Sequence, residues 1–140
     1  MSRMRRWSFI VLLVIITATA VSLVVHRREV RLKRERAATY QQALRSYTDV
    51  LARGATRSQV EDNLRLRGVQ YGRESGFDST KAYADLVKIG TEPAPWYCNK
   101  NNIYLKFAFD AADPGLGGIS QSGSDVLRSI DFMPWLQDCL

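Results

Sequence analysis

The sequence predicts an α+β protein in which an N-terminal transmembrane helix is followed by two helices packed on a small antiparallel sheet of three to four strands. Two observations lead to this fold class. An uncharged apolar run lies near the N-terminus, and the spacing of apolar residues changes from three or four before residue 68 to two after it. We expect four segments: a basic tail (1–6), a transmembrane helix (7–25), a basic helical stalk (26–39) and an α+β domain (40–140).

The positive charge of the chain is concentrated at its N-terminal end. The formal net charge of the 140 residues is +6. Residues 1–36 hold nine Lys or Arg and two acidic residues, a net charge of +7, whereas residues 37–140 hold eleven and twelve, a net charge of −1. The domain is therefore nearly neutral, and the basic segment lacks interleaved aromatic residues, so we expect no nucleic-acid partner.

The apolar run from Trp7 to Val25 contains nineteen residues without a charge. As a helix it is about 28 Å long, close to the hydrocarbon core of a bilayer at roughly 30 Å. Trp7 suits one membrane interface, and His26 and Arg27 suit the other. The alternative is a cleaved signal peptide, because Ala18-Thr19-Ala20 has the form of a cleavage site. The apolar run continues past that site, so we expect an uncleaved anchor.

The charges that flank the run give two answers on orientation. Three Lys or Arg precede it and six follow it between residues 27 and 36, and this count alone places the domain in the cytoplasm. A short basic tail before an apolar run is also typical of a signal anchor, which exports the domain after it, and long domains translocate largely regardless of charge. We expect an extracytoplasmic domain on the cell inner (plasma) membrane and keep the cytoplasmic orientation as the alternative.

The basic residues after the run are candidates for contact with membrane lipid. Attraction to anionic headgroups contributes about 1 kcal/mol per basic residue near the surface. A solvated stop for the membrane helix explains the same residues equally well. The candidate headgroup contacts are Arg27, Arg28, Arg31, Lys33 and Arg34.

Two amphipathic helices are expected after the stalk. The first covers residues 40–53, with Gly54 in the C′ position and an apolar face formed by Tyr40, Ala43, Leu44, Tyr47, Val50 and Leu51. The second begins after Thr56, the N-cap of a capping box, and ends at Gly68.

Alternating apolar residues then predict strands at 68–72, 84–90, 102–109 and 126–133. In the last of these we expect Val126 to share the inner face with Ile130 and Phe132, with Arg128 interrupting that face. The two prolines of residues 91–96 predict a stiff crossing between strands, and residues 110–125 predict a mobile connector.

The stretch LARGATRSQVEDNL, Leu51 to Leu64, resembles the entry motif of small bacterial envelope proteins of the BamE (SmpA/OmlA) group. In that group a Gly-x-Thr-x-x-x-Val helix start precedes a small antiparallel sheet, a unit that also occurs in the β-lactamase inhibitor protein fold. Beyond this stretch the likeness covers residues 40–133 in element order alone. Proteins of the group usually carry a lipobox cysteine near the N-terminus, which this chain lacks. The resemblance implies an extracytoplasmic, non-enzymatic binding or scaffold module, held by a transmembrane anchor in place of a lipid, with an envelope protein as a possible partner.

Catalytic and metal-binding patterns are absent from the sequence. The one histidine, His26, borders the apolar run, so the domain has no Ser–His or Cys–His pair. Two cysteines without a nearby histidine are a poor ligand set for zinc, and no phosphate-binding or dinucleotide-binding motif occurs. We therefore expect no enzymatic activity, no metal ion and no cofactor.

The two cysteines are placed to form a disulfide. Cys98 precedes one long predicted strand and Cys139 follows another. If these strands pair antiparallel, the two ends are neighbours, and an exported domain would then hold a Cys98–Cys139 disulfide.

Overall fold

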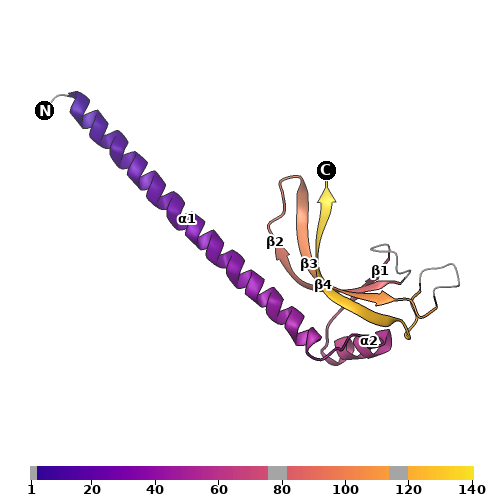
Figure 1. Ribbon diagram of the computed structural model, residues 1–140. Coiled ribbons are helices and arrows are strands. Elements are labelled where there is room, and N and C mark those ends of the chain that lie inside the picture. The colour runs from indigo at the N-terminus through magenta and orange to yellow at the C-terminus, as the bar shows by residue number, and fades with distance from the viewer. Residues whose placement is uncertain (1–2, 76–81, 114–119) are drawn as a thin grey trace. The chain divides into compact units, whose positions relative to one another are not determined.

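A computed structural model describes residues 3–75, 82–113 and 120–140 (Figure 1). The chain divides into two compact units, Met1–Thr39 and Tyr40–Leu140, which are described separately. Among the described residues the elements are α1 (Arg3–Thr48), α2 (Arg57–Leu66), β1 (Gly72–Glu74), β2 (Ala84–Glu92), β3 (Cys98–Asp110) and β4 (Val126–Cys139).

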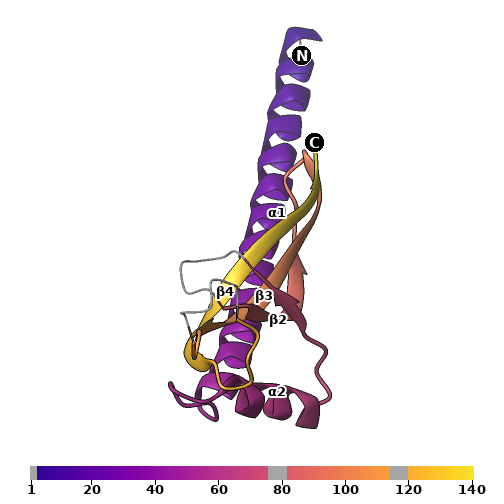
Figure 2. The ribbon, with the colours of Figure 1, turned by 90° about the vertical axis from the view of Figure 1, so that its right-hand side faces the viewer.

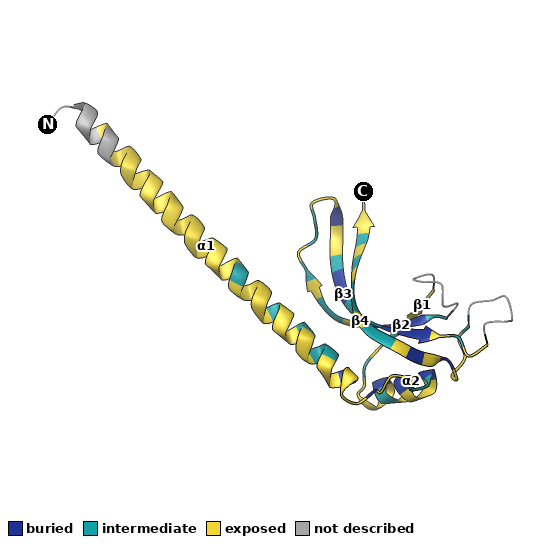
Figure 3. Ribbon diagram, viewed as in Figure 1, coloured by how far each residue is buried: buried dark blue, intermediate teal, exposed yellow. Residues whose placement is uncertain are grey.

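The first unit is helical, and its helix is the N-terminal part of α1. The predicted transmembrane helix, stalk and following helix form one continuous element, because no Gly or Pro interrupts residues 3–48. The described chain therefore has two α-helices where the sequence predicted three. Apolar side chains from Ile10 to Val25 are exposed (Figure 3), and this helix is long and apolar enough to cross a membrane. The hydroxyls of Thr17 and Thr19 donate to carbonyls within the helix, so neither needs a solvent partner there.

The second unit begins with the last turns of α1, which end at Thr48 and not at residue 53 as predicted. The chain leaves the helix early because residues 54–56 pair with β4. The N–H of Gly54 donates to the carbonyl of Leu127 at 3.0 Å, and the N–H of Leu127 donates to Ala55 at 2.8 Å. Gly54 has a φ of 91°, which serves this turn and not a helix C-terminus. Val50, predicted to be on the apolar face, is consequently 59% exposed.

Helix α2 begins as the sequence predicted. The hydroxyl of Thr56 accepts from the N–H of Gln59, and the side chain of Gln59 accepts from the N–H of Thr56 at 2.9 Å, so the capping box is confirmed. At the other end Gly68 has a φ of 66° and donates to Arg65. Val69 donates to Leu64, which completes a Schellman motif.

We expect Thr56→Ala to lower the free energy of unfolding of the domain by about 1 kcal/mol, because an N–H of the first turn loses its acceptor. Urea unfolding of the full chain in detergent, followed by tryptophan fluorescence, measures the change. Ser58→Ala is the matched control, because it removes the hydroxyl of the overlapping motif that the structure does not use as the cap. Equal losses from the two variants would show that the cap does not contribute as inferred.

The four strands form one sheet in the order β1-β2-β3-β4, and each neighbouring pair is antiparallel. Figure 2 shows β2, β3 and β4 of this sheet side by side. The predicted strands at 84–90, 102–109 and 126–133 are confirmed, and all three extend further. The strand predicted at 68–72 is wrong, because Gly68 and Val69 complete the end of α2 and β1 starts at Gly72. Of the connection predicted at 91–96, Thr91 and Glu92 instead belong to β2, and residues 93–96 lie in the hairpin loop that joins β2 to β3.

A β-bulge explains why Arg128 interrupts the apolar pattern of β4. Ala108 pairs with Ser129 and the next residue, Phe109, pairs with Leu127, so Arg128 is the extra residue of the bulged strand. The bulge moves Leu127 to the inner face, where it is 3% exposed, whereas Val126 is 39% exposed. The prediction that Val126 faces inward is therefore wrong.

The core lies between the inner face of the sheet and helical residues of the second unit. The rings of Tyr47 and Phe107 meet edge to face, with centroids 5.4 Å apart. The buried cluster consists of Tyr47, Leu51, Val60, Leu64, Val87, Leu105, Phe107, Phe109 and Leu127. The predicted inner positions of the 102–109 strand and of the second helix are thus buried as expected.

Candidate functional site

The predicted disulfide joins the start of β3 to the end of β4. Cys98 and Cys139 are register partners, their Cα atoms are 4.0 Å apart, and their sulfurs are bonded. The N–H of Leu140 donates to the carbonyl of Tyr97 at 2.8 Å on the next rung. The bond closes a sequence separation of 41 residues and ties down a chain terminus that would otherwise fray.

The five candidate headgroup residues lie along the exposed surface of α1 in the first unit. Arg27, Arg31 and Arg34 share one side of the helix, because they are three and four residues apart. Arg31 donates to Glu35 at 2.8 Å, and this hydrogen bond, together with the charge of Glu35, raises the pKa of Arg31. The contact of Arg27, Arg28, Arg31, Lys33 and Arg34 with lipid stays a prediction.

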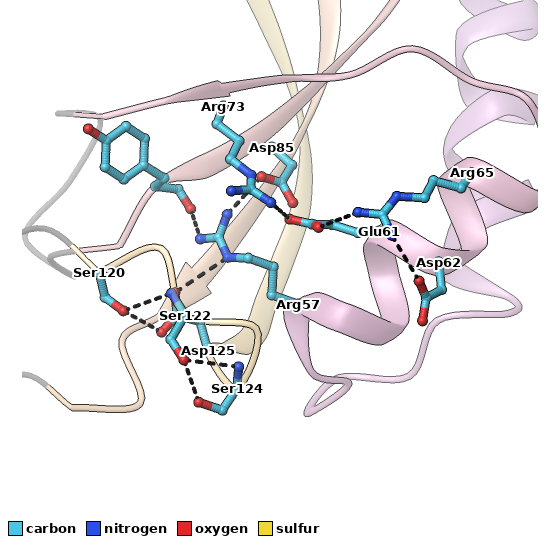
Figure 4. A network of polar contacts seen from close by, with 11 residues as sticks. Arg57, Glu61, Asp62, Arg65, Arg73, Asp85, Ser120, Ser122, Ser124 and Asp125 are labelled. Atoms are coloured by element: carbon cyan, nitrogen blue, oxygen red, sulfur yellow. Dashed lines mark hydrogen bonds and ion pairs between the residues drawn. The ribbon is translucent and has the colours of Figure 1, made fainter.

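A fully buried arginine connects α2 to the sheet (Figure 4). Arg57 is the first residue of α2, and its side chain has no exposed surface. Its Nη1 donates to Oδ1 of Asp85 at 2.7 Å, and its Nη2 donates to the carbonyl of Tyr83. Its Nε lies 3.4 Å from Oδ2 of Asp125, and its guanidinium carbon lies 4.1 Å from the ring centroid of Phe109. Two buried carboxylates and an aromatic face therefore surround one cation.

Asp125 extends this network into the connector between β3 and β4. Its Oδ1 accepts from the N–H of Ala112 at 3.0 Å and from the hydroxyl of Ser120 at 2.7 Å. Its carbonyl accepts from the N–H of Arg57 at 2.8 Å. The sequence predicted that residues 110–125 form a mobile connector. Both described ends of it are instead held by Asp125, and residues 114–119 lie outside the described part of the chain.

A second ion pair lies one helical turn further along α2. Glu61, whose side chain is 8% exposed, accepts from Arg73 of β1 at 2.6 Å. Arg65 contacts the other carboxylate oxygen of Glu61 at 3.4 Å, but its own side chain is 64% exposed. Arg57 and Glu61 thus connect α2 to two neighbouring strands, β2 and β1.

Burial raises the pKa of Asp85 from 3.8 to about 6, and the positive charge of Arg57 offsets part of that rise. The folded state therefore binds a proton at Asp85 more tightly than the unfolded chain does. Stability from this group is fully present below about pH 4 and is lost as the pH rises through about 6.

We expect Asp85 to stabilise the domain by about 2 kcal/mol more at pH 4.5 than at pH 7.5. Asp85→Asn should remove most of this dependence, because an amide does not titrate. Urea unfolding of both proteins at the two pH values measures it, with Asp131→Asn as an exposed control. An unchanged pH dependence in Asp85→Asn would assign the titration to another group.

The network suits stabilisation and not ligand binding. The side chains of Arg57, Asp85 and Asp125 have no exposed surface, so a ligand has no approach to them. Among the described residues, no group of three or more His, Cys, Asp or Glu side chains is placed to hold a metal ion. The sequence carried a weak signal for this network, because Arg57 shares a helix face with Val60 and Leu64 and Asp85 alternates with Val87.

Described residues of the second unit line two open grooves. One, with a volume of about 350 Å³, lies on the sheet face opposite the core and combines aromatic with polar side chains. In this groove the ring centroids of Tyr104 and Trp135 are 5.9 Å apart, and the exposed Lys88 lines the same groove. The other, of about 320 Å³, lies between the end of α1 and β4. No sequence pattern predicted either groove, because each is lined by segments far apart in the chain.

No family model, curated protein or solved structure matches the chain. The resemblance of Leu51 to Leu64 to the BamE group therefore stays a prediction from the sequence.

Proposed function

We propose that the chain is a single-pass membrane protein that presents a small, non-enzymatic binding or scaffold domain outside the cytoplasm, in the cell envelope. The observation that carries the proposal is the Cys98–Cys139 disulfide. Disulfides persist in oxidising compartments and are rare in the cytoplasm. The apolar stretch of α1 supplies the anchor, and a signal-anchor orientation exports the domain after it.

A binding role accounts for the open surfaces of the domain better than catalysis does. Its strongest electrostatic feature, the network around Arg57, is closed to solvent. The open groove on the outer face of the sheet combines aromatic and amide side chains, and the groove beside β4 combines aliphatic and charged ones, mixtures typical of recognition surfaces. The expected partners are membrane lipid at the anchor and an envelope protein at the domain.

The second candidate function is a cytoplasm-facing domain whose basic residues bind anionic lipid. The six Lys or Arg between residues 27 and 36, against three before the apolar run, favour it. In this orientation Cys98 and Cys139 would face a reducing compartment and remain thiols.

A reporter fused after Leu140 separates the two candidates. We expect activity from an enzyme that folds only outside the cytoplasm and no signal from a fluorescent protein that folds only inside it. The opposite pair of results would reject the proposal in favour of the lipid-binding alternative.

Alkylation of protein isolated without reductant tests the disulfide directly. Both cysteines should resist labelling until reduction. Cys98→Ser should leave Cys139 open to the reagent, which controls for access of the reagent to the thiol.

Two further measurements test the membrane anchor. The unchanged protein should stay in the membrane after alkaline washing, and its N-terminus should lie before Trp7. An N-terminus at Val21 would establish a cleaved signal peptide.

A further inference from the structure

β4 is an edge strand, and most of its outer edge is unpaired among the described residues of the second unit. β4 is the last strand in the order β1-β2-β3-β4 and pairs along its whole length with β3. It has fourteen residues, and an edge strand of this length presents a row of backbone N–H and C=O groups that can pair with another extended chain.

The protein's own chain already occupies one end of this edge. Gly54 and Ala55 exchange two hydrogen bonds with Leu127, at 3.0 and 2.8 Å, and Thr56 forms an antiparallel bridge with Val126. The outer edge of β4 therefore accepts strand pairing, and among the described residues this pairing stops at Leu127.

Pro134 limits the edge at the other end. Proline has no N–H, so within a sheet it is confined to positions where no ladder donor is needed. Pro134 lies opposite Ile103 in regular register and has no N–H to donate to β3, so we infer that this is a non-hydrogen-bonded pair whose backbone groups face the outer edge. Residues two apart point the same way, so we infer that the N–H groups of Ile130 and Phe132 also point outward. The available edge thus runs from Arg128 to Met133.

A groove accompanies this part of the edge. The residues of β4 that line it are the consecutive positions Leu127 to Asp131, and the opposite wall comes from Thr48, Leu51, Ala52 and Arg53. Consecutive strand residues alternate between the two faces of a sheet, so a groove lined by all of them opens on the edge of the strand. Ile130, which is half-buried, offers apolar contact in the groove, whereas Leu51 beneath it is only 8% exposed.

The charged groups beside the groove select the chemistry of the occupant. Arg53 is exposed and makes no ion pair with a described residue. Arg128, from the same groove, lies 3.9 Å from Asp110, which offsets its positive charge. Asp131 keeps its negative charge and accepts a hydrogen bond from Ser129 at 2.7 Å. Among the described residues that line the groove, Arg53 therefore carries the positive charge without an ion pair, and it favours an acidic side chain beside it.

We propose that residues 128–133 of β4 bind an extended segment of a partner protein by strand addition, with alternating apolar and acidic residues. This inference rests on the binding role proposed above and names its partner class. Backbone hydrogen bonds to Ile130 and Phe132 supply the pairing, the apolar residues of the segment pack beside the half-buried Ile130, and a carboxylate pairs with Arg53.

The test uses the full chain in zwitterionic detergent micelles and fluorescein-labelled peptides, read by fluorescence anisotropy. The acidic peptide Val-Glu-Val-Glu-Val-Glu-Val should bind. The same peptide with alternate backbone nitrogens methylated should bind at least about tenfold more weakly, a loss of about 1.4 kcal/mol, because strand addition requires its N–H donors. The lysine counterpart, Val-Lys-Val-Lys-Val-Lys-Val, should also bind more weakly.

Arg53→Glu should reverse the preference between the acidic and the lysine peptide. It changes an exposed side chain, so the fold and the disulfide should be retained. Arg45→Glu is the matched control, because it makes the same change on an exposed residue near the end of α1 that does not line the groove. That variant should keep the preference of the unchanged protein.

Three results of the peptide measurements would overturn the inference. They are no binding of the acidic peptide, equal binding of its methylated form, and a preference unaffected by Arg53→Glu. A stable dimer in micelles that the peptide leaves intact would also overturn it and would assign the edge to a second copy of the chain. A reporter signal from the cytoplasm, in contrast, rejects the proposed function whether or not the peptide binds.

Discussion

Arg57→Met is expected to lower the free energy of unfolding of the domain by about 3–5 kcal/mol, because it leaves Asp85 and Asp125 buried without their cation. A buried charge that loses its partner keeps its desolvation penalty, and Met fills much of the volume of Arg, so the loss is electrostatic. Urea unfolding of the full chain at pH 7.5, where Asp85 is ionised, measures it.

Arg65→Met is the control for this variant, because it removes an arginine from the same helix whose side chain is 64% exposed. Exposed ion pairs contribute little, so this loss should stay below about 1 kcal/mol. Arg57→Met combined with Asp85→Leu should be less destabilising than the sum of the two single changes. Additive effects would show that the two side chains are not coupled.

Phe107→Ala is expected to lower the free energy of unfolding by about 3–5 kcal/mol. The ring of Phe107 is fully buried on the inner face of β3 and meets the ring of Tyr47 at an interplanar angle of 87°. Removing the ring loses the transfer free energy of the side chain and leaves a cavity. The residues around that cavity belong to different elements, which cannot all move inward to fill it, so their van der Waals contacts with the ring are lost as well.

Tyr104→Ala provides the comparison, because it truncates an aromatic residue on the opposite face of the same strand, where the side chain is half-buried. This change should cost less than Phe107→Ala when both are measured by urea unfolding. If Tyr104→Ala or the cap variant Thr56→Ala proves worse than Phe107→Ala, the core is not centred on the inner face of β3.

Local features of the sequence determined the parts of the fold that depend on local physics. The apolar run from Trp7 to Val25 predicts a helix that is long enough to cross a membrane, because that depends on length and composition alone. The cap at Thr56 and the turn at Gly68 were predicted because capping involves residues three or four positions apart. The pairing of Cys98 with Cys139 followed from one general property of antiparallel strands, the closeness of the start of one to the end of its neighbour.

Only the tertiary structure decided the features that depend on contacts between distant segments. α1 ends at Thr48 because Gly54 and Ala55 pair with Leu127, more than 70 positions away in the sequence. The bulge at Arg128 reverses which side of β4 faces the core, and a period-two pattern cannot place such a shift without its partner strand. Arg57, Asp85 and Asp125 meet for the same reason. The sequence places Arg57 and Asp85 on apolar faces, which is a weak signal of burial, but it does not show that they meet Asp125. The network forms only when α2, β2 and the connector before β4 close around one another.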